Sequence, residues 1–148
     1  MSATNAFETS LLGLFFTNVD AANVGDATGL RGSTTAGSFY ISLHTADPGE
    51  TGTQDTNDSL YTGYARVAVA RSVAQWTVTN NTADNDNAIT FPACTGGSES
   101  ETHFGLGSAA ALSSAGNLFL YGALTAPLSV SNGITPSFAA GALDVTFD

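Results

Sequence analysis

From residue 38 onward, apolar and polar residues alternate one by one, in short runs that turn-forming residues interrupt. The clearest run is the segment FYISLH, in which Phe39, Ile41 and Leu43 alternate with more polar neighbours. Successive side chains of a β-strand point to opposite faces of a sheet, so a period of two predicts a half-buried strand. Because this period recurs along most of the chain, the sequence predicts an all-β fold.

The strand-like runs continue to the C-terminus, and the segments DPG (residues 47–49), NN (residues 80–81) and NG (residues 132–133) are predicted turns between them. About eight short strands are typical of a β-sandwich or a jelly roll, and their spacing does not choose the topology. The run 118–123 is the most apolar, which predicts a place at the centre of a sheet. The further strands are expected at residues 64–71, 76–78, 89–91, 103–107, 118–123, 128–130, 134–138 and 143–147.

The first residues follow a helical period instead. Their apolar residues recur every three to four positions, and Asn5 and Glu8 have the spacing of an N-terminal capping pair. A helix of about three turns is marginal alone, so it must lie on its own domain or on a neighbouring subunit. The apolar side is expected to comprise Phe7, Leu11, Leu12, Leu14 and Phe15, and the candidate interface residues are Phe7, Leu11, Leu12 and Phe15.

Residues 19–35 lose this helical period and contain three glycines, which predicts a loop or arm. The polar stretch 51–59 is likewise expected to be an exposed loop. No change of composition divides the strand region. We therefore expect an N-terminal helix and arm over residues 1–37, and a single β-sandwich domain over residues 38–148.

The charge balance excludes several functions. The chain has no lysine, only three arginines and 13 acidic residues, for a formal net charge of −10. Nucleic-acid binding requires Lys and Arg to neutralise phosphates, and an anionic membrane repels such a chain, so neither partner is expected. The acidity either provides solubility or keeps free copies apart before assembly.

The surface is also unusual, because charged residues make up 11% of the chain, whereas soluble domains average about 25%. Ser, Thr, Asn and Gly must supply most of the polar surface. These short neutral residues lose less free energy than Lys or Glu when they are desolvated in a contact. A surface of this kind suits broad contact with other proteins.

Cys94 is the one cysteine, so no intrachain disulfide can form, and we expect a buried, inert thiol. The N-terminus lacks the pattern of a signal peptide, and the apolar run 11–16 is far shorter than the roughly 20 residues of a membrane helix. We expect the protein to stay in the host cytoplasm before assembly or lysis.

Histidine is the first place to look for catalysis. His44 lies three residues before Asp47, a spacing that suits a base with an orienting carboxylate. The alternative, which we favour, is a polar residue on the solvent side of a strand. The sequence contains no nucleophile elbow, phosphate-binding glycine loop or paired cysteine motif. We therefore expect no catalytic residue and no cofactor.

Two acidic patterns bear on metal binding. Glu99, Glu101 and His103 would share one face of an extended strand, either as a divalent-metal face or as an exposed acidic edge that discourages strand pairing. The segments DTND (residues 55–58) and DNDN (residues 84–87) lack the Gly and Glu of an EF-hand loop, so ordinary turns are favoured. We predict no metal site, although a surface calcium stays open.

Five stretches, in this order, resemble a family of small virion proteins of tailed phages that are labelled tail fibre or head decoration proteins. They are FYISLHTADPGETGTQ, YTGYARVAVAR, ITFPACTGG, THFGLG and GNLFLYGALTAPLSVSNGITPSFAAGALDVTFD. They lie between Phe39 and Asp148, about three quarters of the chain. The resemblance implies a virion component without enzymatic activity.

Two structural roles fit this resemblance. A capsid decoration, or cement, protein is small and compact and offers a neutral contact surface on the outside of the head, as this chain does. A tail fibre or adsorption component usually shows length or repeats, and none is visible here. We favour decoration, with the major capsid protein and copies of the chain itself as partners in a homo-oligomer. In the alternative role, the partners are tail proteins.

Overall fold

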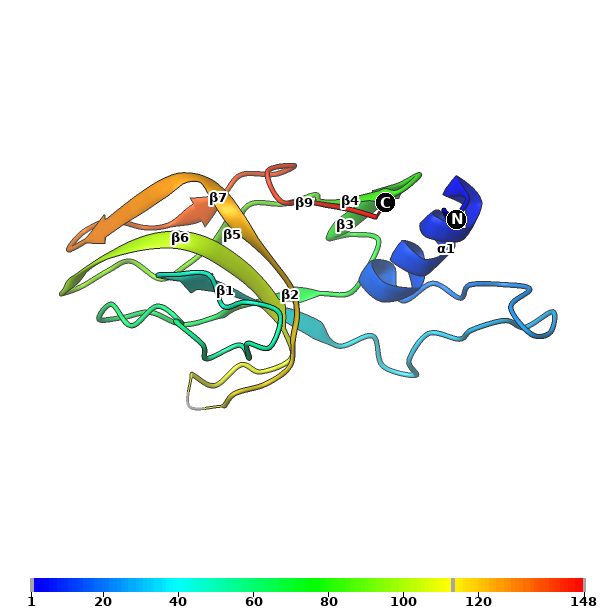
Figure 1. Ribbon diagram of the computed structural model, residues 1–148, viewed down its shortest axis with the longest axis horizontal. Helices are drawn as coiled ribbons and strands as arrows, with labels where there is room; N and C mark the ends of the chain where they lie inside the picture. The colour runs from blue at the N-terminus through cyan, green and yellow to red at the C-terminus, as the bar shows by residue number, and fades with distance from the viewer. Residues whose placement is uncertain (1, 113, 148) are drawn as a thin grey trace. The chain divides into compact units, whose positions relative to one another are not determined.

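The computed structural model describes residues 2–112 and 114–147. The predicted all-β fold with a short N-terminal helix is confirmed. The expected strands 118–123 and 128–130 are parts of one strand, β7, whereas β4 is not predicted by the sequence. In chain order the elements are α1 (Asn5–Leu12), the π-helical turn η1 (Gly13–Thr17), β1 (Ser38–His44), β2 (Val67–Ala70), β3 (Trp76–Thr79), β4 (Thr82–Asn85), β5 (Ile89–Thr90), β6 (Ser98–Gly107), β7 (Leu118–Ser131), β8 (Ser137–Phe138) and β9 (Asp144–Thr146) (Figure 1).

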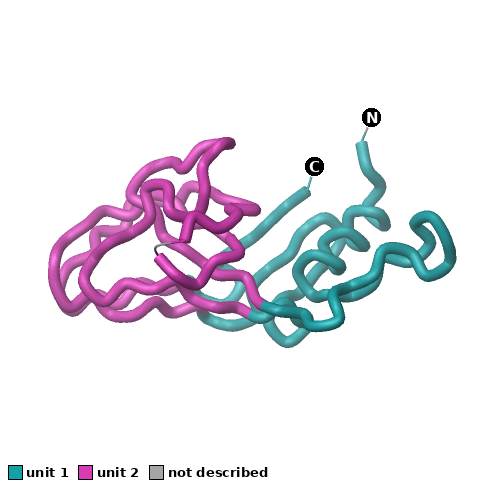
Figure 2. The backbone as a smooth tube through the Cα atoms, turned by 90° about the horizontal axis from the view of Figure 1, so that it is seen from below, with its two compact units in different colours: residues 1–37, 70–88, 138–148 teal, residues 38–69, 89–137 magenta. Residues whose placement is uncertain are grey.

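The chain divides into two compact units, which Figure 2 distinguishes by colour. Unit 1 comprises residues 1–37, 70–88 and 138–148, and unit 2 comprises residues 38–69 and 89–137. The division into an N-terminal helix and arm over residues 1–37 and one sandwich domain over residues 38–148 stays a prediction. None of the described helices has the length and apolar character needed to cross a lipid bilayer.

Unit 2 is built on a four-stranded sheet with the order β2-β1-β6-β7. The β1–β6 and β6–β7 pairs are antiparallel, and a separate two-stranded sheet joins β5 to β8. Burial of one large aliphatic or aromatic side chain stabilises a fold by about 1.5–3 kcal/mol. Cys94 is also buried, as predicted. The buried side chains of unit 2 include Ile41, Leu43, Phe91 and Leu106.

Strand β1 has the predicted alternation, but its second face is not solvent-exposed. Ser42 and His44 are fully buried, because β1 lies inside the sheet and the polar segment 53–59 covers this face. Within that segment, Gln54 and Ser59 are fully buried. The expectation of an exposed loop over residues 51–59 is therefore wrong for the residues that contact the sheet.

The apolar sequence of β7 predicts a place at the centre of the sheet, and this prediction is wrong. The strand lies at the end of the sheet and pairs with β6 alone among the described strands. The interior places belong to β1 and β6, and in β6 a Cβ atom on Gly105 would lie 2.6 Å from Leu118 Cδ1 and 2.8 Å from His44 Nε2. Glycine lets neighbouring side chains close over the strand. Apolar content therefore does not determine the order of strands.

Unit 1 packs the N-terminal helical segment against a three-stranded sheet with the order β3-β4-β9. Leu12, Phe16 and Trp76 are buried, and the ring centroids of Phe16 and Trp76 lie 4.8 Å apart. Strands β3 and β4 form an antiparallel hairpin. Asn80 adopts a φ of 54° between them, which asparagine tolerates better than most residues, and this confirms the turn at residues 80–81.

Strand β4 includes residues that the sequence assigns to a turn. Asn85 ends this strand, and its buried amide donates hydrogen bonds to the carbonyl oxygens of Asn87 and Ala139, both at 2.8 Å. Its side-chain oxygen accepts a hydrogen bond from the backbone N–H of Leu143 at 2.9 Å. Buried backbone groups need such partners. A residue type that is common in turns here stabilises the sheet of unit 1.

The start of α1 differs from the prediction. Thr4 is the N-cap residue and no side chain caps the helix, so the predicted Asn5–Glu8 capping pair is wrong. The buried side of the helical segment comprises Glu8, Leu12 and Phe16, while Phe7 is 45% exposed. The apolar residues are compatible with more than one helical stripe, and the position of the sheet decides which stripe is buried.

Arg71 satisfies the carbonyl groups at the C-terminal end of the helical segment. Its guanidinium donates hydrogen bonds to the carbonyl oxygens of Phe15 at 2.6 Å, Leu14 at 2.7 Å and Ala36 at 3.0 Å. The last carbonyl groups of a helix lack partners within the helix, and a cationic donor is favoured there. One of the three arginines therefore has a structural role in unit 1.

Candidate functional site

His44 has a buried partner set that differs from both readings of its sequence position. Its Nδ1 lies 2.9 Å from the carbonyl oxygen of Thr56, which can only accept, so Nδ1 carries the proton. Its Nε2 then accepts a hydrogen bond from Ser42 Oγ at 2.9 Å. Burial lowers the pKa of His44, which favours this neutral form. Asp47 is not a partner of this ring in any hydrogen bond of the described chain.

A serine beside a histidine resembles the start of a nucleophilic site, but this pair is not accessible. Ser42 and His44 are both 0% exposed. A nucleophile must lie in a pocket that admits a substrate, and neither residue lines the hollow beside β7 or the groove beside the helical segment. The pair therefore holds β1 to the segment that covers it. The predicted solvent-exposed histidine is wrong.

A buried ion pair lies beside this histidine in unit 2. Asp58 Oδ2 accepts hydrogen bonds from Arg66 Nη2 at 2.8 Å and from Arg66 Nε at 3.0 Å. Asp58 Oδ1 accepts a hydrogen bond from the hydroxyl of Tyr64 at 2.8 Å. Both carboxylate oxygens thus have donors, so Asp58 is part of a satisfied network. The segment DTND (residues 55–58) places its last aspartate in this ion pair.

Glu99 and Glu101 form a second acidic group, and Glu101 does not lie on an exposed edge. Glu101 is fully buried, and its Oε2 atom has no hydrogen-bond partner. Ser59 Oγ lies 2.8 Å from Glu101 Oε1 and 2.9 Å from Glu99 Oε2. His103 contacts Thr102 Oγ1 through its Nδ1 at 2.9 Å. Within residues 2–112 and 114–147, no three side chains of the metal-ligating types are grouped to hold an ion.

The contacts of Ser59 require that one of the two carboxyl groups holds a proton. A hydroxyl has a single hydrogen and cannot donate to two carboxylates at once. The backbone N–H of Leu60 donates to Glu99 Oε2 at 2.9 Å and to Glu99 Oε1 at 3.1 Å, so both oxygens of Glu99 accept, whereas Glu101 Oε2 has no partner. We therefore assign the proton to Glu101, which donates to Ser59, while Ser59 donates to Glu99. Burial, together with the charge of Glu99, raises the pKa of Glu101 to about 7.

This proton produces a testable pH dependence. A carboxyl group whose pKa rises on folding, here from 4.5 to about 7, stabilises the folded state less as the pH rises between those values. At about 1.4 kcal/mol per pKa unit, the full shift corresponds to about 3.5 kcal/mol, of which about 3 kcal/mol is lost between pH 4.5 and pH 8. Glu101→Gln removes the titration. Chemical denaturation at pH 4.5 and pH 8 should therefore show that the variant gains this amount relative to the natural chain as the pH rises.

The matched control is Glu50→Gln, because Glu50 is an exposed glutamate of the same unit. We expect its stability to follow that of the natural chain across the same pH range. A Glu101→Gln variant whose stability also follows the natural chain would show that Glu101 is ionised in the folded protein, and would contradict the assigned proton.

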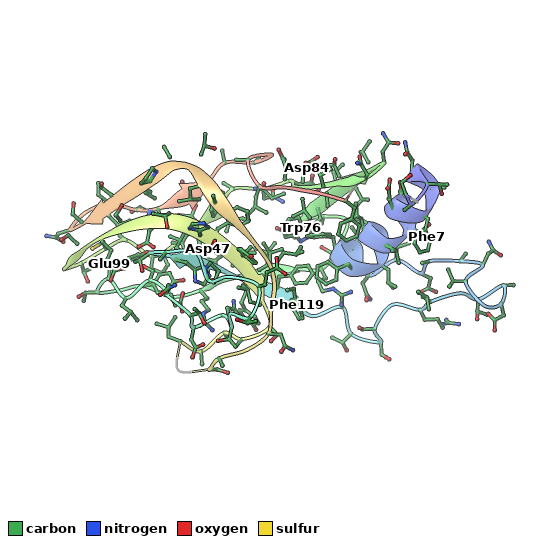
Figure 3. All side chains as sticks on the ribbon, viewed as in Figure 1. Phe7, Asp47, Trp76, Asp84, Glu99 and Phe119 are labelled. Carbon is green, nitrogen blue, oxygen red and sulfur yellow. The ribbon has the colours of Figure 1, made fainter. Side chains whose placement is uncertain are left out.

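The four candidate interface residues occupy different environments in unit 1. Phe7 is exposed on α1 (Figure 3), Leu11 and Phe15 are partly exposed, and Leu12 is fully buried. Leu12 therefore contributes to the core of its own unit. A groove of about 470 Å³ lies beside the helical segment, and the exposed side chains of Val19 and Val73 are among its lining. Contact of this surface with a partner stays a prediction.

In unit 2 the long strand β7 is largely exposed, although its sequence predicts a place at the centre of the sheet. Most of its side chains are partly or fully exposed, and Val130 is its one buried residue. A hollow of about 470 Å³ adjoins its first four residues and is also lined by Gly49, Glu50 and Gly52. A signal for this surface exists in the sequence, because no Asp, Glu, Lys or Arg lies between Glu101 and Asp144.

The comparison with known families gives a match over almost the whole sequence. A family model described as Podophage GP4 fiber I protein gp80 matches residues 2–146. The matched range contains α1 and all nine described strands, so it covers both units. No curated protein matches the sequence.

Proposed function

Because this chain belongs to the family of the podophage GP4 fiber I protein gp80, we propose that it is a tail fibre component that acts by binding other virion proteins. The chain is a structural protein of a phage. The family description names a fibre, and it supports the tail role that our sequence analysis gave as the alternative to head decoration. The proposed partners are tail proteins and further copies of the chain on the outside of the particle.

The family match carries this proposal, and the exposed surface of the chain supports it. The Ser42–His44 pair is inaccessible, and the Glu99–Glu101 pair is occupied by Ser59 and Leu60. Unit 2 instead offers to solvent a long strand without charged residues, β7. Such surfaces support protein contact better than chemistry, because charged groups at an interface must be desolvated. We therefore propose a non-enzymatic role.

Immunogold electron microscopy of purified phage particles tests the proposed location. With an antibody raised against this chain, we expect gold at the tail and none over the head. Pre-absorption of the antibody with the purified chain is the control and should remove the label. Gold spread evenly over the head would contradict the tail role and would support the decoration role instead.

A further inference from the structure

The outer side of β7 is an open sheet edge. β7 spans Leu118–Ser131 and, among the described strands, pairs with β6 on one side only. In the described part of the chain, no loop or turn forms a backbone hydrogen bond with residues 120–123. In an edge strand, alternate backbone N–H and C=O groups point outward, and such a row is a template for another strand.

Two irregularities in the pairing of β7 with β6 limit the part of this edge that is regular. Between the register pairs Glu101–Leu128 and His103–Ala123, Thr102 of β6 faces residues 124–127 of β7, so the second half is interrupted by a bulge. Pro127 lies in this bulge and cannot donate a backbone hydrogen bond. Bulges and prolines are the usual means by which proteins prevent edge pairing. A second register shift, opposite Phe119, interrupts the start of β7, so the regular part of this edge without proline is residues 120–123.

The charge distribution indicates what can approach this edge. The chain has a net charge of −10, so most of its surface repels a second copy. The stretch from residue 102 to residue 143 contains no Asp, Glu, Lys or Arg, and β7 lies entirely within it. An identical copy brought against β7 therefore meets no like charge on the strand itself, and the carboxylates that act on this strand are those of Glu50 and Asp47, which lie beside Tyr121 on another segment. This makes a second copy a fitting partner for this edge.

We propose that residues 120–123 of β7 pair edge to edge with the same residues of a second copy, forming one antiparallel sheet across two subunits. This inference deepens the proposed function, on which it rests, by naming the surface through which copies join. Antiparallel pairing of one strand with itself follows a two-fold axis, so both copies use the same patch. Backbone hydrogen bonds provide the attraction, as in other cases of strand addition.

A pairing of four residues buries much less surface than a standard interface, so we expect weak, concentration-dependent association in solution. On a particle, neighbouring attachment sites hold copies at high local concentration, which makes a weak contact effective. The proposed contact therefore does not require that the free chain be a permanent dimer. It requires that association in solution depend on β7.

Sedimentation equilibrium of the purified full chain tests this with two variants. Ala123→Glu adds a carboxylate to the exposed end of the pairing segment, and Ala68→Glu adds the same group to β2, the opposite edge strand of the same sheet. We expect Ala123→Glu to raise the dissociation constant by about tenfold or more. Ala68→Glu should associate like the natural chain, and circular dichroism should show that both variants are folded.

Hydrogen–deuterium exchange of the natural chain gives a second measurement that needs no variant. Amides of residues 120–123 should exchange more slowly at high protein concentration than at low concentration, and those of β2 should not change. A natural chain that is monomeric at every concentration, or an Ala123→Glu variant that associates as well as the natural chain, would overturn the pairing. These results would not affect the proposed location, because gold labelling of the tail is independent of association in solution.

Discussion

Replacing Arg66 with methionine is expected to lower the free energy of unfolding by about 3–5 kcal/mol, because it leaves Asp58 as a buried charge without a partner. Arg66 is 6% exposed and Asp58 is 8% exposed, so water cannot take over the lost interaction. Methionine keeps much of the side-chain volume, so the effect reports the guanidinium group rather than a cavity. This is the largest effect that we expect from a single substitution in unit 2.

The guanidinium also holds the connection between β6 and β7. Its Nη1 atom donates hydrogen bonds to the carbonyl oxygens of Ala109 at 3.1 Å, Ala111 at 2.9 Å and Ser114 at 3.2 Å. Nη2 donates to the carbonyl oxygen of Gln54 at 3.0 Å. Few side chains other than arginine have enough donors in one plane for such a set. Loss of Arg66 should therefore also loosen this connection.

Urea denaturation followed by circular dichroism measures this loss. Arg31→Met is the matched control, because Arg31 is exposed and its substitution should change the unfolding free energy by less than about 0.5 kcal/mol. The double variant Arg66→Met with Asp58→Asn should recover part of the loss, since it removes the uncompensated charge. An Arg66→Met variant as stable as the Arg31→Met control would show that the ion pair contributes little.

The second large effect is expected for Gly107→Ala in β6. A Cβ atom at this position would collide with the side-chain amide of Gln54 and would lie 2.7 Å from the carbonyl oxygen of Asn117. A backbone carbonyl cannot rotate away, and overpacking of this kind costs about 1–3 kcal/mol. Gln54 is itself fixed, because its Nε2 donates to the carbonyl of Tyr40 at 2.7 Å and its Oε1 accepts from the N–H of Ala109 at 3.0 Å. We therefore expect an effect near the upper end of this range.

Gly96→Ala in the same unit is the matched control, because its nearest atom, Thr62 Oγ1, lies 3.4 Å from the added carbon. Thermal denaturation should show a clearly lower melting temperature for Gly107→Ala and a small change for Gly96→Ala. Equal melting temperatures for the two variants would mean that the segment carrying Gln54 can move aside. In that case the close approach of this segment to β6 would not be required.

The period of two around Phe39, Ile41 and Leu43 was sufficient to predict β1 and the all-β class, because the direction of successive side chains is a local property of the backbone. The turn at residues 80–81 was also predictable, since its residue type determines which φ angles are accessible. Two of the errors have one origin. The sequence assigned Ser42 and His44 to solvent and residues 118–123 to the sheet centre, and both judgements concern neighbours that are distant in the sequence.

The candidate site shows the same division. The alternation of Glu99, Glu101 and His103 was visible in the sequence, but their chemistry depends on Ser59, which lies 42 residues before Glu101 and reaches it only in the folded chain. Likewise, the sequence presents Arg66 as an ordinary residue of a predicted strand, and only the structure shows the carbonyl groups that it binds. The uncharged stretch 102–143 was a sequence signal for the proposed contact surface, yet only the strand order shows that β7 has an open edge.

The sequence by itself determined most of the strands, the turn at residues 80–81, that the chain is acidic overall and that one long stretch carries no charge. The tertiary structure alone decided the order of the strands, the partners of the buried Arg66 and Glu101, and which edge of the sheet is left open. The physical reason is that backbone preference and periodicity act between near neighbours. Burial and strand pairing instead depend on segments that meet only when the chain folds.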